Sequence, residues 1–147
     1  MFTPDEVAGI VDLFGLLTRE EAETAIAELA YRRGQEPPEE AVNDALSSFA
    51  LVGVDRDGER FLAPGPAAFP TFPDGAEDLP HILDLDDRSV DTDRRVDAAT
   101  ARLRTEAVCA VTVGDAERAT ELIDISYDLE AWGDRDLSGI RAFLDAA

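Results

Sequence analysis

The chain has 147 residues, of which 33 are acidic and 13 are basic, so its formal net charge is −20. Every basic residue is arginine, and 45% of the residues are hydrophobic. The charge excludes a basic nucleic-acid-binding protein, and the apolar content, which recurs at helical spacing, argues against disorder. Charges that repel at physiological salt are screened in molar salt, where the Debye length falls to about 3 Å. The composition therefore predicts a folded protein adapted to concentrated salt.

Cysteine and histidine, which often serve as catalytic residues or metal ligands, are scarce. Cys109 is the single cysteine and His81 the single histidine, which excludes an intramolecular disulfide and multi-cysteine or multi-histidine metal sites. No apolar run approaches the length of about 18 residues that a membrane span needs. The segment Met1–Glu6 also lacks the basic start of a signal peptide. We therefore expect a cytoplasmic protein without a membrane span.

Two helices are predicted in the first 34 residues. Thr3–Glu6 is a capping box with proline at the first helical position, and this helix should end near Gly15. Thr18–Glu21 repeats the box, and Gly34 supplies the stop of the second helix. Apolar residues follow each box at helical spacing, so each helix should bury one face.

A third helix and a β-hairpin follow. The third helix is expected to begin at Pro37-Pro38 and to bury a stripe that includes Val42 and Ala45. Residues 51–54 and 59–63 have strand composition, and Arg56-Asp57-Gly58 between them is a turn signal. The order of three helices and a hairpin resembles the winged helix-turn-helix over residues 4–65, and we assign residues 1–65 to this unit. A three-helix unit with an additional hairpin is the alternative.

Residues 66–90 are predicted to be a proline-rich and acidic linker. Four prolines and two glycines between residues 64 and 75 exclude a helix or a central strand there. Because Phe69 and Phe72 would be costly to leave in water, we expect them to pack on the C-terminal helices and hold the two halves together.

Residues 91–147 are predicted to form a helical hairpin and a short terminal helix. Asp91-Thr92-Asp93 should cap a long helix that ends at Gly114, and Asp115 should cap the next one. Asp136 should begin the last helix. The predicted fold class is therefore mainly α with a small β-hairpin, and the two halves could share one continuous core.

The charge of the third helix bears on whether its exposed surface binds DNA or protein. This helix has no positive charge, and residues 1–65 hold five arginines against fourteen carboxylates, a net −9. DNA binding needs local cations that contact phosphates and bases, so nucleic acid is disfavoured relative to a protein partner or self-association. The candidate interaction residues are Asn43, Ser47, Arg56, Arg60, Phe69, Phe72, His81, Tyr127 and Trp132.

Motifs for catalysis, metals and cofactors are not recognised. Residues 84–95 resemble a calcium loop, but Ser89 replaces the required glycine and Arg95 replaces the closing glutamate. The apolar neighbours of Cys109 predict a buried thiol with a raised pKa, and His81 is expected to hydrogen-bond a nearby backbone group. We therefore expect no catalytic residue, metal or cofactor, and no enzyme.

Several segments together resemble an uncharacterised family of halophilic-archaeal proteins, a resemblance that spans nearly the whole chain. They are Thr3–Gly9, Val11–Gly15, Gly65–Pro70, Leu79–Ile82 and Tyr127–Trp132. The resemblance implies a salt-rich cytoplasm and transfers no catalytic residue. Two functional hypotheses remain, a non-catalytic adaptor or regulatory protein-interaction module and a winged-helix transcription regulator that binds DNA at high salt.

Overall fold

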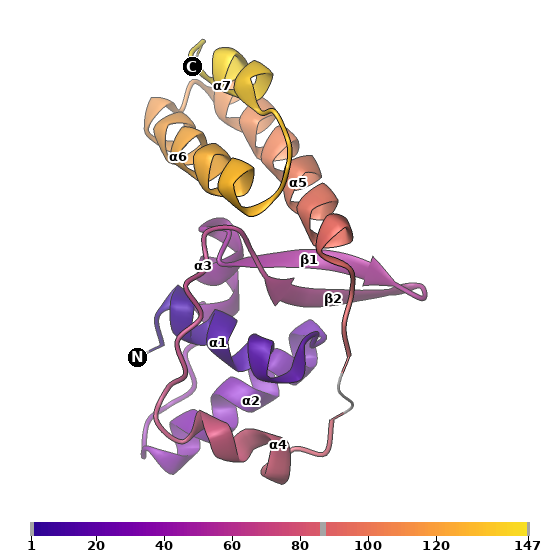
Figure 1. Cartoon of the computed structure of the whole chain (residues 1–147). Helices are drawn as coiled ribbons and strands as arrows, with labels where there is room; N and C mark the ends of the chain where they lie inside the picture. Colours follow the sequence, from indigo (N-terminus) through magenta and orange to yellow (C-terminus); the bar gives the residue numbers. More distant parts are fainter. Residues whose placement is uncertain (1, 86–87, 147) are drawn as a thin grey trace.

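The computed structural model describes residues 2–85 and 88–146 and confirms a mainly helical fold with a small β-hairpin. The elements in chain order are α1 (Pro4–Phe14), α2 (Arg19–Arg32), α3 (Ala41–Ser47), β1 (Leu51–Arg56), β2 (Glu59–Pro64), the 3-10 helix η1 (Ala76–Asp78), α4 (Leu79–Ile82), α5 (Thr92–Val113), α6 (Ala116–Trp132) and α7 (Ser138–Leu144). Figure 1 shows the hairpin between α1 and α2 on one side and α5 to α7 on the other.

Both predicted capping boxes are present. The Thr3 hydroxyl accepts a hydrogen bond from the Glu6 amide at 3.2 Å, and the Glu6 carboxylate accepts one from the Thr3 amide at 3.1 Å. Thr18 and Glu21 make the same reciprocal pair at 3.2 and 2.9 Å. Each box satisfies two backbone donors that the first turn of a helix leaves free, so the starts of α1 and α2 are encoded locally.

The third helix begins later than predicted, at Ala41 rather than at Pro37-Pro38. Residues 35–38 have no regular structure, and a turn at residues 39–40 leads into α3. Two consecutive prolines favour an extended backbone because each one restricts the residue before it. Glu40 occupies the N-cap position without a side-chain cap, so α3 is a short helix of 7 residues.

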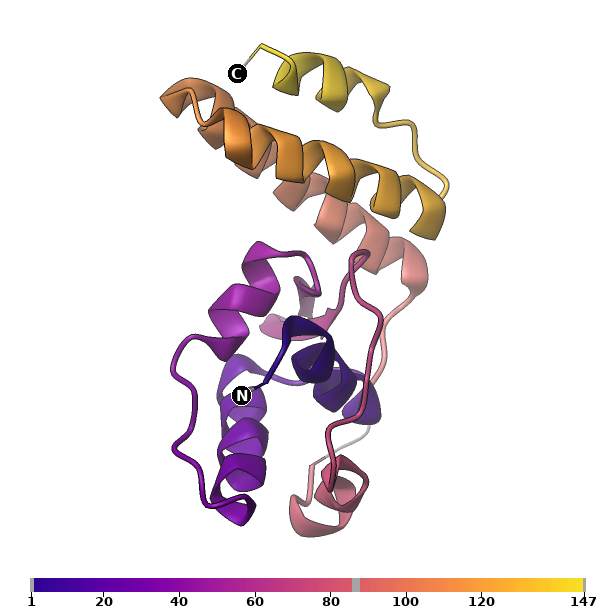
Figure 2. The same ribbon diagram turned by 90° about the vertical axis from the view of Figure 1, so that its left-hand side faces the viewer.

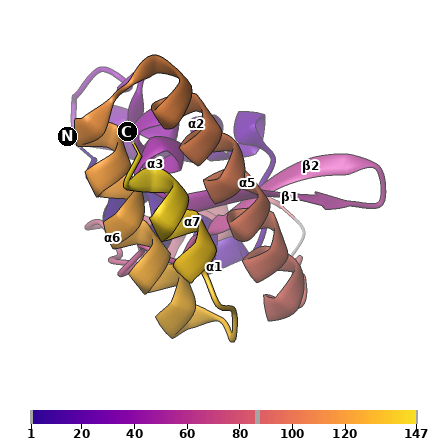
Figure 3. The same ribbon diagram turned by 90° about the horizontal axis from the view of Figure 1, so that it is seen from above.

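The hairpin has the predicted turn and continuous antiparallel pairing. Its register runs from Leu51 opposite Pro64 to Arg56 opposite Glu59. The turn residues Asp57 and Gly58 have φ angles of 51° and 83°, the pair of positive values that a two-residue type I′ turn requires. Seen from above in Figure 3, the hairpin tip extends beyond the helices.

Leu17, between α1 and α2, adds a one-residue bridge to the edge of β2. Its amide donates to the Leu62 carbonyl at 3.2 Å, and the Leu62 amide donates back at 2.6 Å. The bridge ties the α1–α2 connection to the hairpin, so α1, α2 and the sheet form one unit.

The two faces of the hairpin belong to different buried clusters. Leu51 and Leu62 pack with residues of α1, α2 and α3. Val54 and Phe61 pack with α5, α6 and α7. Because side chains alternate between the faces of a strand, one hairpin serves both helical layers. The predicted unit of residues 1–65 therefore contains the hairpin but not α5 to α7, the helices that cover one of its faces.

The segment around Phe69 and Thr71 lies against α1 rather than on the C-terminal helices, which corrects our prediction. The Thr71 amide donates to the Asp5 carbonyl at 3.1 Å, and the Phe69 amide donates to the Asp5 carboxylate at 3.1 Å. A Cβ at Gly9 would lie 2.0 Å from the Thr71 carbonyl oxygen, so the two backbones meet at this glycine. From there the chain descends to α4 at the far end of the molecule (Figures 1 and 2).

The three C-terminal helices lie side by side, with α5 and α6 antiparallel (Figure 3). Gly114, at φ 70°, ends α5, and the Asp115 carboxylate accepts from the Arg118 amide at 3.0 Å to cap α6. The last helix begins at Ser138 rather than at Asp136. The carboxylate of Asp136 accepts from the Ser138 amide at 3.0 Å, so it caps the helix from outside. The predicted helical hairpin is confirmed.

Candidate functional site

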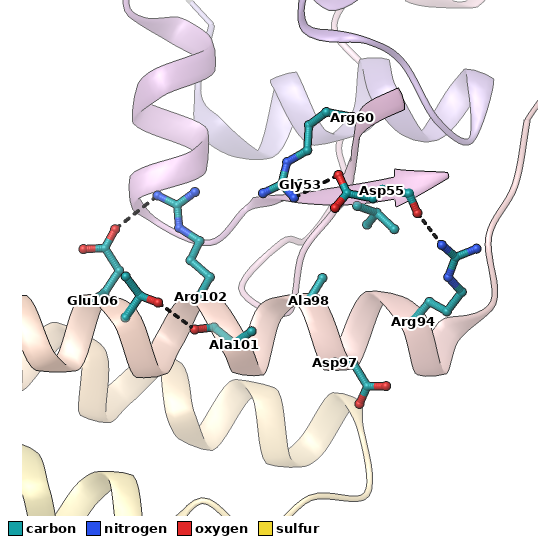
Figure 4. A pocket seen from close by; sticks show the side chains of 11 residues that line it. Gly53, Asp55, Arg60, Arg94, Asp97, Ala98, Ala101, Arg102 and Glu106 are labelled. Atoms are coloured by element: carbon teal, nitrogen blue, oxygen red, sulfur yellow. Dashed lines mark hydrogen bonds and ion pairs between the residues drawn. The ribbon is translucent and has the colours of Figure 1, made fainter. Parts of the chain in front are cut away.

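A groove of about 670 Å³ opens between the β-hairpin and α5 (Figure 4), and we call it the hairpin groove. Gly53 of β1 contributes only backbone to its lining, and Ala98 and Ala101 of α5 contribute methyl groups. Its charged lining residues are Arg60, Arg94, Arg102, Asp55, Asp97 and Glu106. Three of the thirteen arginines of the chain therefore meet here, with only three of its 33 carboxylates.

The arginines of the hairpin groove have few partners. Arg60 donates to the Asp55 carboxylate at 3.3 Å, and Arg102 donates to Glu106 at 3.3 Å. Arg94 donates to the backbone carbonyl of Asp55, without a carboxylate partner among the described residues. Figure 4 shows Arg94 and Arg102 extending from α5 toward the hairpin, whereas Arg60 lies over the far side of β1 and borders the groove from there. The groove is thus a cluster of cations in a strongly acidic protein.

A second, smaller hollow lies between α5 and α7, and we call it the α5–α7 groove. It measures about 260 Å³ and is lined by Arg104, Ala107, Val108, Gly139, Ile140 and Phe143. Val108 and Phe143 are 53% and 44% exposed. The lining contains no carboxylate. This groove is therefore an apolar surface that carries one cation.

Glu21 and Glu130 accept hydrogen bonds that fix the linker and α7 to the rest of the protein. Arg88, at the end of the linker, lowers the pKa of Glu21 chiefly through its hydrogen bonds, against an opposing effect of burial. The hydrogen bond from Arg141 lowers the pKa of Glu130, and the Leu137 amide adds to the effect at 2.8 Å. Both carboxylates are stabilised as anions by structural partners, so we assign them a role in docking the linker and α7.

The predicted residues of α3 are engaged in local contacts. Asn43 accepts from Arg19 at 2.6 Å and donates to Glu40 at 3.0 Å. The carbonyl of Ser47 accepts from Arg118 of α6 at 3.0 Å. The C-terminal end of α3 therefore faces a helix of the other half.

The two arginines of the hairpin lie in different surroundings. Arg56 pairs with its neighbour Asp57 near the tip at 3.7 Å. Arg60 lies over β1 and borders the hairpin groove. The structure therefore separates two residues that we had considered as a pair.

The predicted aromatic residues differ in burial. Phe69 and Phe72 are 82% and 56% exposed, so our expectation that they pack on the C-terminal helices is wrong. The linker backbone is held to α1 while its aromatic side chains face solvent. Tyr127 is also exposed and lies under the Arg141 guanidinium, and Trp132 is half-buried beside Arg95.

Cys109 and His81 are both exposed. The prediction of a buried Cys109 is wrong, because Ala107 and Ala110 take the buried positions of this turn of α5 and Cys109 lies on its solvent side. His81 is exposed in α4, and no hydrogen bond of its ring is found within the described part of the chain. The helix of His81, α4, and the helix of Cys109, α5, lie in different parts of the molecule (Figure 1). These side chains therefore do not form a nucleophile and base.

The acidic segment that resembles a calcium loop is described in part, since Asp86 and Asp87 lie outside the described residues. Within residues 2–85 and 88–146, no three His, Cys, Asp or Glu side chains gather into a set that could hold a metal ion. Over the same residues, no helix combines the length and apolar character needed to cross a bilayer.

Residues 5–147 match the model of a family of unknown function, DUF7109. The chain belongs to the DUF7109 family. No curated protein and no solved structure matches it. The match covers both helical halves and the linker, which confirms the resemblance to an uncharacterised family.

Sequence reasoning missed the residues that form the two grooves of this DUF7109 protein. Arg94, Ala98, Ala101 and Thr105 recur at helical spacing along α5 and could have been recognised as one face. Nothing in that spacing shows that Arg60 of the hairpin lies opposite. Val108 and Phe143 are far apart in sequence, and only the docking of α7 on α5 brings them together.

Proposed function

We propose that this DUF7109 protein is a non-catalytic regulatory or adaptor module of a salt-rich cytoplasm, and that it self-associates through the α5–α7 groove. The acidic, lysine-free composition supports the salt-rich setting. The observation that supports self-association is the carboxylate-free apolar lining of this groove in a chain of net charge −20.

The charge of the groove favours a second copy as its occupant. In a two-fold dimer the same patch faces itself, so an acidic patch would repel its copy, whereas a carboxylate-free patch does not. Arg104, in the lining, makes no hydrogen bond, ion pair or ring contact with any described residue. In such a dimer the carboxylate partners of this guanidinium would come from residues around the lining, because the lining itself holds none.

The shape of the α5–α7 groove is also suited to self-association. Phe143 and Val108 project partly into solvent, while Ala107 and Gly139 leave space beside them. A patch that carries both projecting and small side chains can pack against its own copy about a two-fold axis. Burial of the exposed apolar side chains would supply the driving force.

Sedimentation equilibrium in molar KCl over a range of concentrations tests this proposal. The wild type should dimerise, and Val108→Asp or Phe143→Asp should shift it to monomer because two carboxylates would then face each other. Val113→Asp is the matched control, since Val113 is 75% exposed on the same helix and outside the groove lining. A monomeric wild type at every concentration, or equal effects of Val108→Asp and Val113→Asp, would overturn the proposal.

The non-catalytic part of the proposal is supported by the separate, exposed positions of His81 and Cys109. Neither residue lines the hairpin groove or the α5–α7 groove. A screen of ester, phosphoester and peptide substrates should therefore give no activity that is lost in the His81→Ala or Cys109→Ala variant. Activity that depends on either residue would contradict this part.

A winged-helix DNA-binding regulator is the second candidate, and the Leu17–Leu62 bridge is the observation that favours it. With this bridge the N-terminal half follows the winged helix-turn-helix order of helix, short strand, two helices and hairpin. The exposed residues Glu39, Glu40 and Asp44 in and before α3 argue against it, because carboxylates repel phosphates.

Fluorescence anisotropy with labelled duplex DNA, from low to molar KCl, tests the DNA-binding candidate. Binding should be strongest at low salt and should weaken in the variant with Arg56→Ala plus Arg60→Ala. Arg33→Ala is the control, since Arg33 is the C-cap residue of α2 and contacts Asp74 and Phe2. No binding at any salt concentration, or binding that the double substitution leaves unchanged, would exclude this candidate.

A further inference from the structure

The guanidinium groups of the hairpin groove have unused hydrogen-bond donors. A guanidinium carries five N–H donors. Arg60, Arg94 and Arg102 each make a single hydrogen bond to a described residue. By contrast, Arg118 and Arg141, which join structural elements, each make two or more. The three groove arginines thus retain donors for a ligand that supplies acceptors.

One of these donors is buried. The Nε atom of Arg102 is shielded from solvent and has no hydrogen-bond partner among the described residues. The same guanidinium lies 5.4 Å from the centre of the Phe49 ring, which holds the side chain against the hairpin side of α5. An unpaired buried donor costs free energy, so the protein alone does not fully satisfy the Arg102 guanidinium.

Gly53 allows Arg60 to lie close against the strand. A Cβ at this position would lie 2.6 Å from Nε and 2.7 Å from Nη2 of Arg60. The absence of a side chain therefore lets the guanidinium lie across β1, where it borders the groove (Figure 4). One side of the groove is built around a guanidinium in this position.

The carboxylates of the groove do not fill it. Asp55 and Glu106 already accept from Arg60 and Arg102. Asp97 accepts from Arg135, outside the groove, at 2.8 Å, and Figure 4 shows it pointing away from the hairpin. Three cations and two carboxylates then face the open space, which favours an anion.

From these contacts we infer that the hairpin groove binds a small molecule through an oxyanion, a phosphate or carboxylate group that Arg60, Arg94 and Arg102 hold together. Guanidinium groups match the planar geometry of such oxyanions and bind them with paired hydrogen bonds. A volume of about 670 Å³ accommodates a metabolite-sized ligand rather than a lone ion. The ligand would join the hairpin to α5, and this inference does not depend on self-association.

Isothermal titration calorimetry in molar KCl tests the inference, with inorganic pyrophosphate and citrate as separate probes. The wild type should give saturable binding of at least one probe. Arg94→Gln and Arg102→Gln should each raise its Kd by about tenfold or more, the loss expected for hydrogen bonds to a charged group. Arg32→Gln, at an exposed arginine of α2 that lines neither groove, should leave the Kd unchanged.

Gly53→Ala tests the geometry without altering any charge. The added methyl group should displace the flexible end of Arg60, so binding should weaken while the circular dichroism spectrum stays that of the wild type. Binding of pyrophosphate alone identifies a phosphate ligand, and binding of citrate alone identifies a carboxylate ligand. Failure of both probes to saturate, or a Kd that rises as much in Arg32→Gln as in Arg102→Gln, would overturn the inference.

Discussion

The guanidinium of Arg88 donates to both carboxylate oxygens of Glu21, at 2.7 and 3.1 Å. One of those oxygens also accepts from the Thr18 amide at 2.9 Å, so the residue that caps α2 is also the anchor of the linker. Both side chains are only 20% exposed. The Glu21 carboxylate therefore caps the start of α2 and also fixes the linker at Arg88, 67 residues later in the chain.

Arg88→Gln should lower the free energy of unfolding by about 1–3 kcal/mol, because it removes paired hydrogen bonds between charged groups in a half-buried site. Arg56→Gln is the control, since Arg56 and Asp57 form an exposed pair worth at most about 1 kcal/mol. Urea unfolding in molar KCl measures both. Equal losses in the two variants would contradict a specific role for Arg88.

The contribution of Glu21 should depend on pH. Because Arg88 lowers its pKa in the folded state, the stabilisation is complete above the ordinary carboxyl pKa and is lost as the pH falls through the lower folded value. The difference in melting temperature between wild type and Arg88→Gln should therefore shrink as the pH falls from about 6 to 3. A difference that stays constant over this range would show that Glu21 does not titrate as described.

Gly9→Ala should destabilise the protein by about 1–3 kcal/mol, since the new methyl group would collide with the Thr71 backbone and displace the linker from α1. Gly139→Ala is the matched helical control, because nothing lies within 4 Å of its Cβ position, and it should be neutral or stabilising. Thermal unfolding distinguishes the two. The same sign of effect in both variants would contradict the close packing of the linker.

The variant with Phe69→Ser plus Phe72→Ser should unfold at the wild-type temperature, because both side chains are already exposed to solvent. Phe14→Ala, a change at a side chain that is 3% exposed, should cost about 3–5 kcal/mol. Thermal unfolding at molar salt compares the two variants. A large loss in the double variant would show that these aromatics pack against the protein in solution.

Glu130→Gln should loosen the docking of α7. Glu130 accepts from Arg141 at 3.0 Å and from the Leu137 amide at 2.8 Å, so it joins α6 to the start of the last helix. Hydrogen exchange of the α7 amides should accelerate while exchange in α1 stays unchanged. Asp128→Asn, an exposed change on α6, is the control. Unchanged α7 exchange in Glu130→Gln would remove this carboxylate from the docking contact.

Local signals accounted for most of the secondary structure. The capping boxes at Thr3 and Thr18, the Asp57-Gly58 turn and the Gly114-Asp115 connection lie where the sequence predicts them. Each depends on contacts within a few residues, so the neighbouring chain is sufficient to specify it. The start of α3 was predicted wrongly because the proline pair marks an extended segment rather than a first helical turn.

The burial of single residues was less predictable. Cys109 and Phe69 were both expected to be buried because of their apolar character, and both are exposed. Burial depends on which side of an element meets another element, and hydrophobic character alone does not specify that side. Neither groove could be predicted for the same reason.

The sequence by itself determined the acidic, lysine-free composition, the helical class, the capping boxes of α1 and α2 and the hairpin turn, because these depend on composition and on short-range contacts. Only the tertiary structure decided that the linker lies on α1 at Gly9, that the hairpin is covered on both faces, and that Arg60 meets Arg94 and Arg102. These are contacts between residues far apart in the chain, and their geometry arises when the helices and the hairpin pack together.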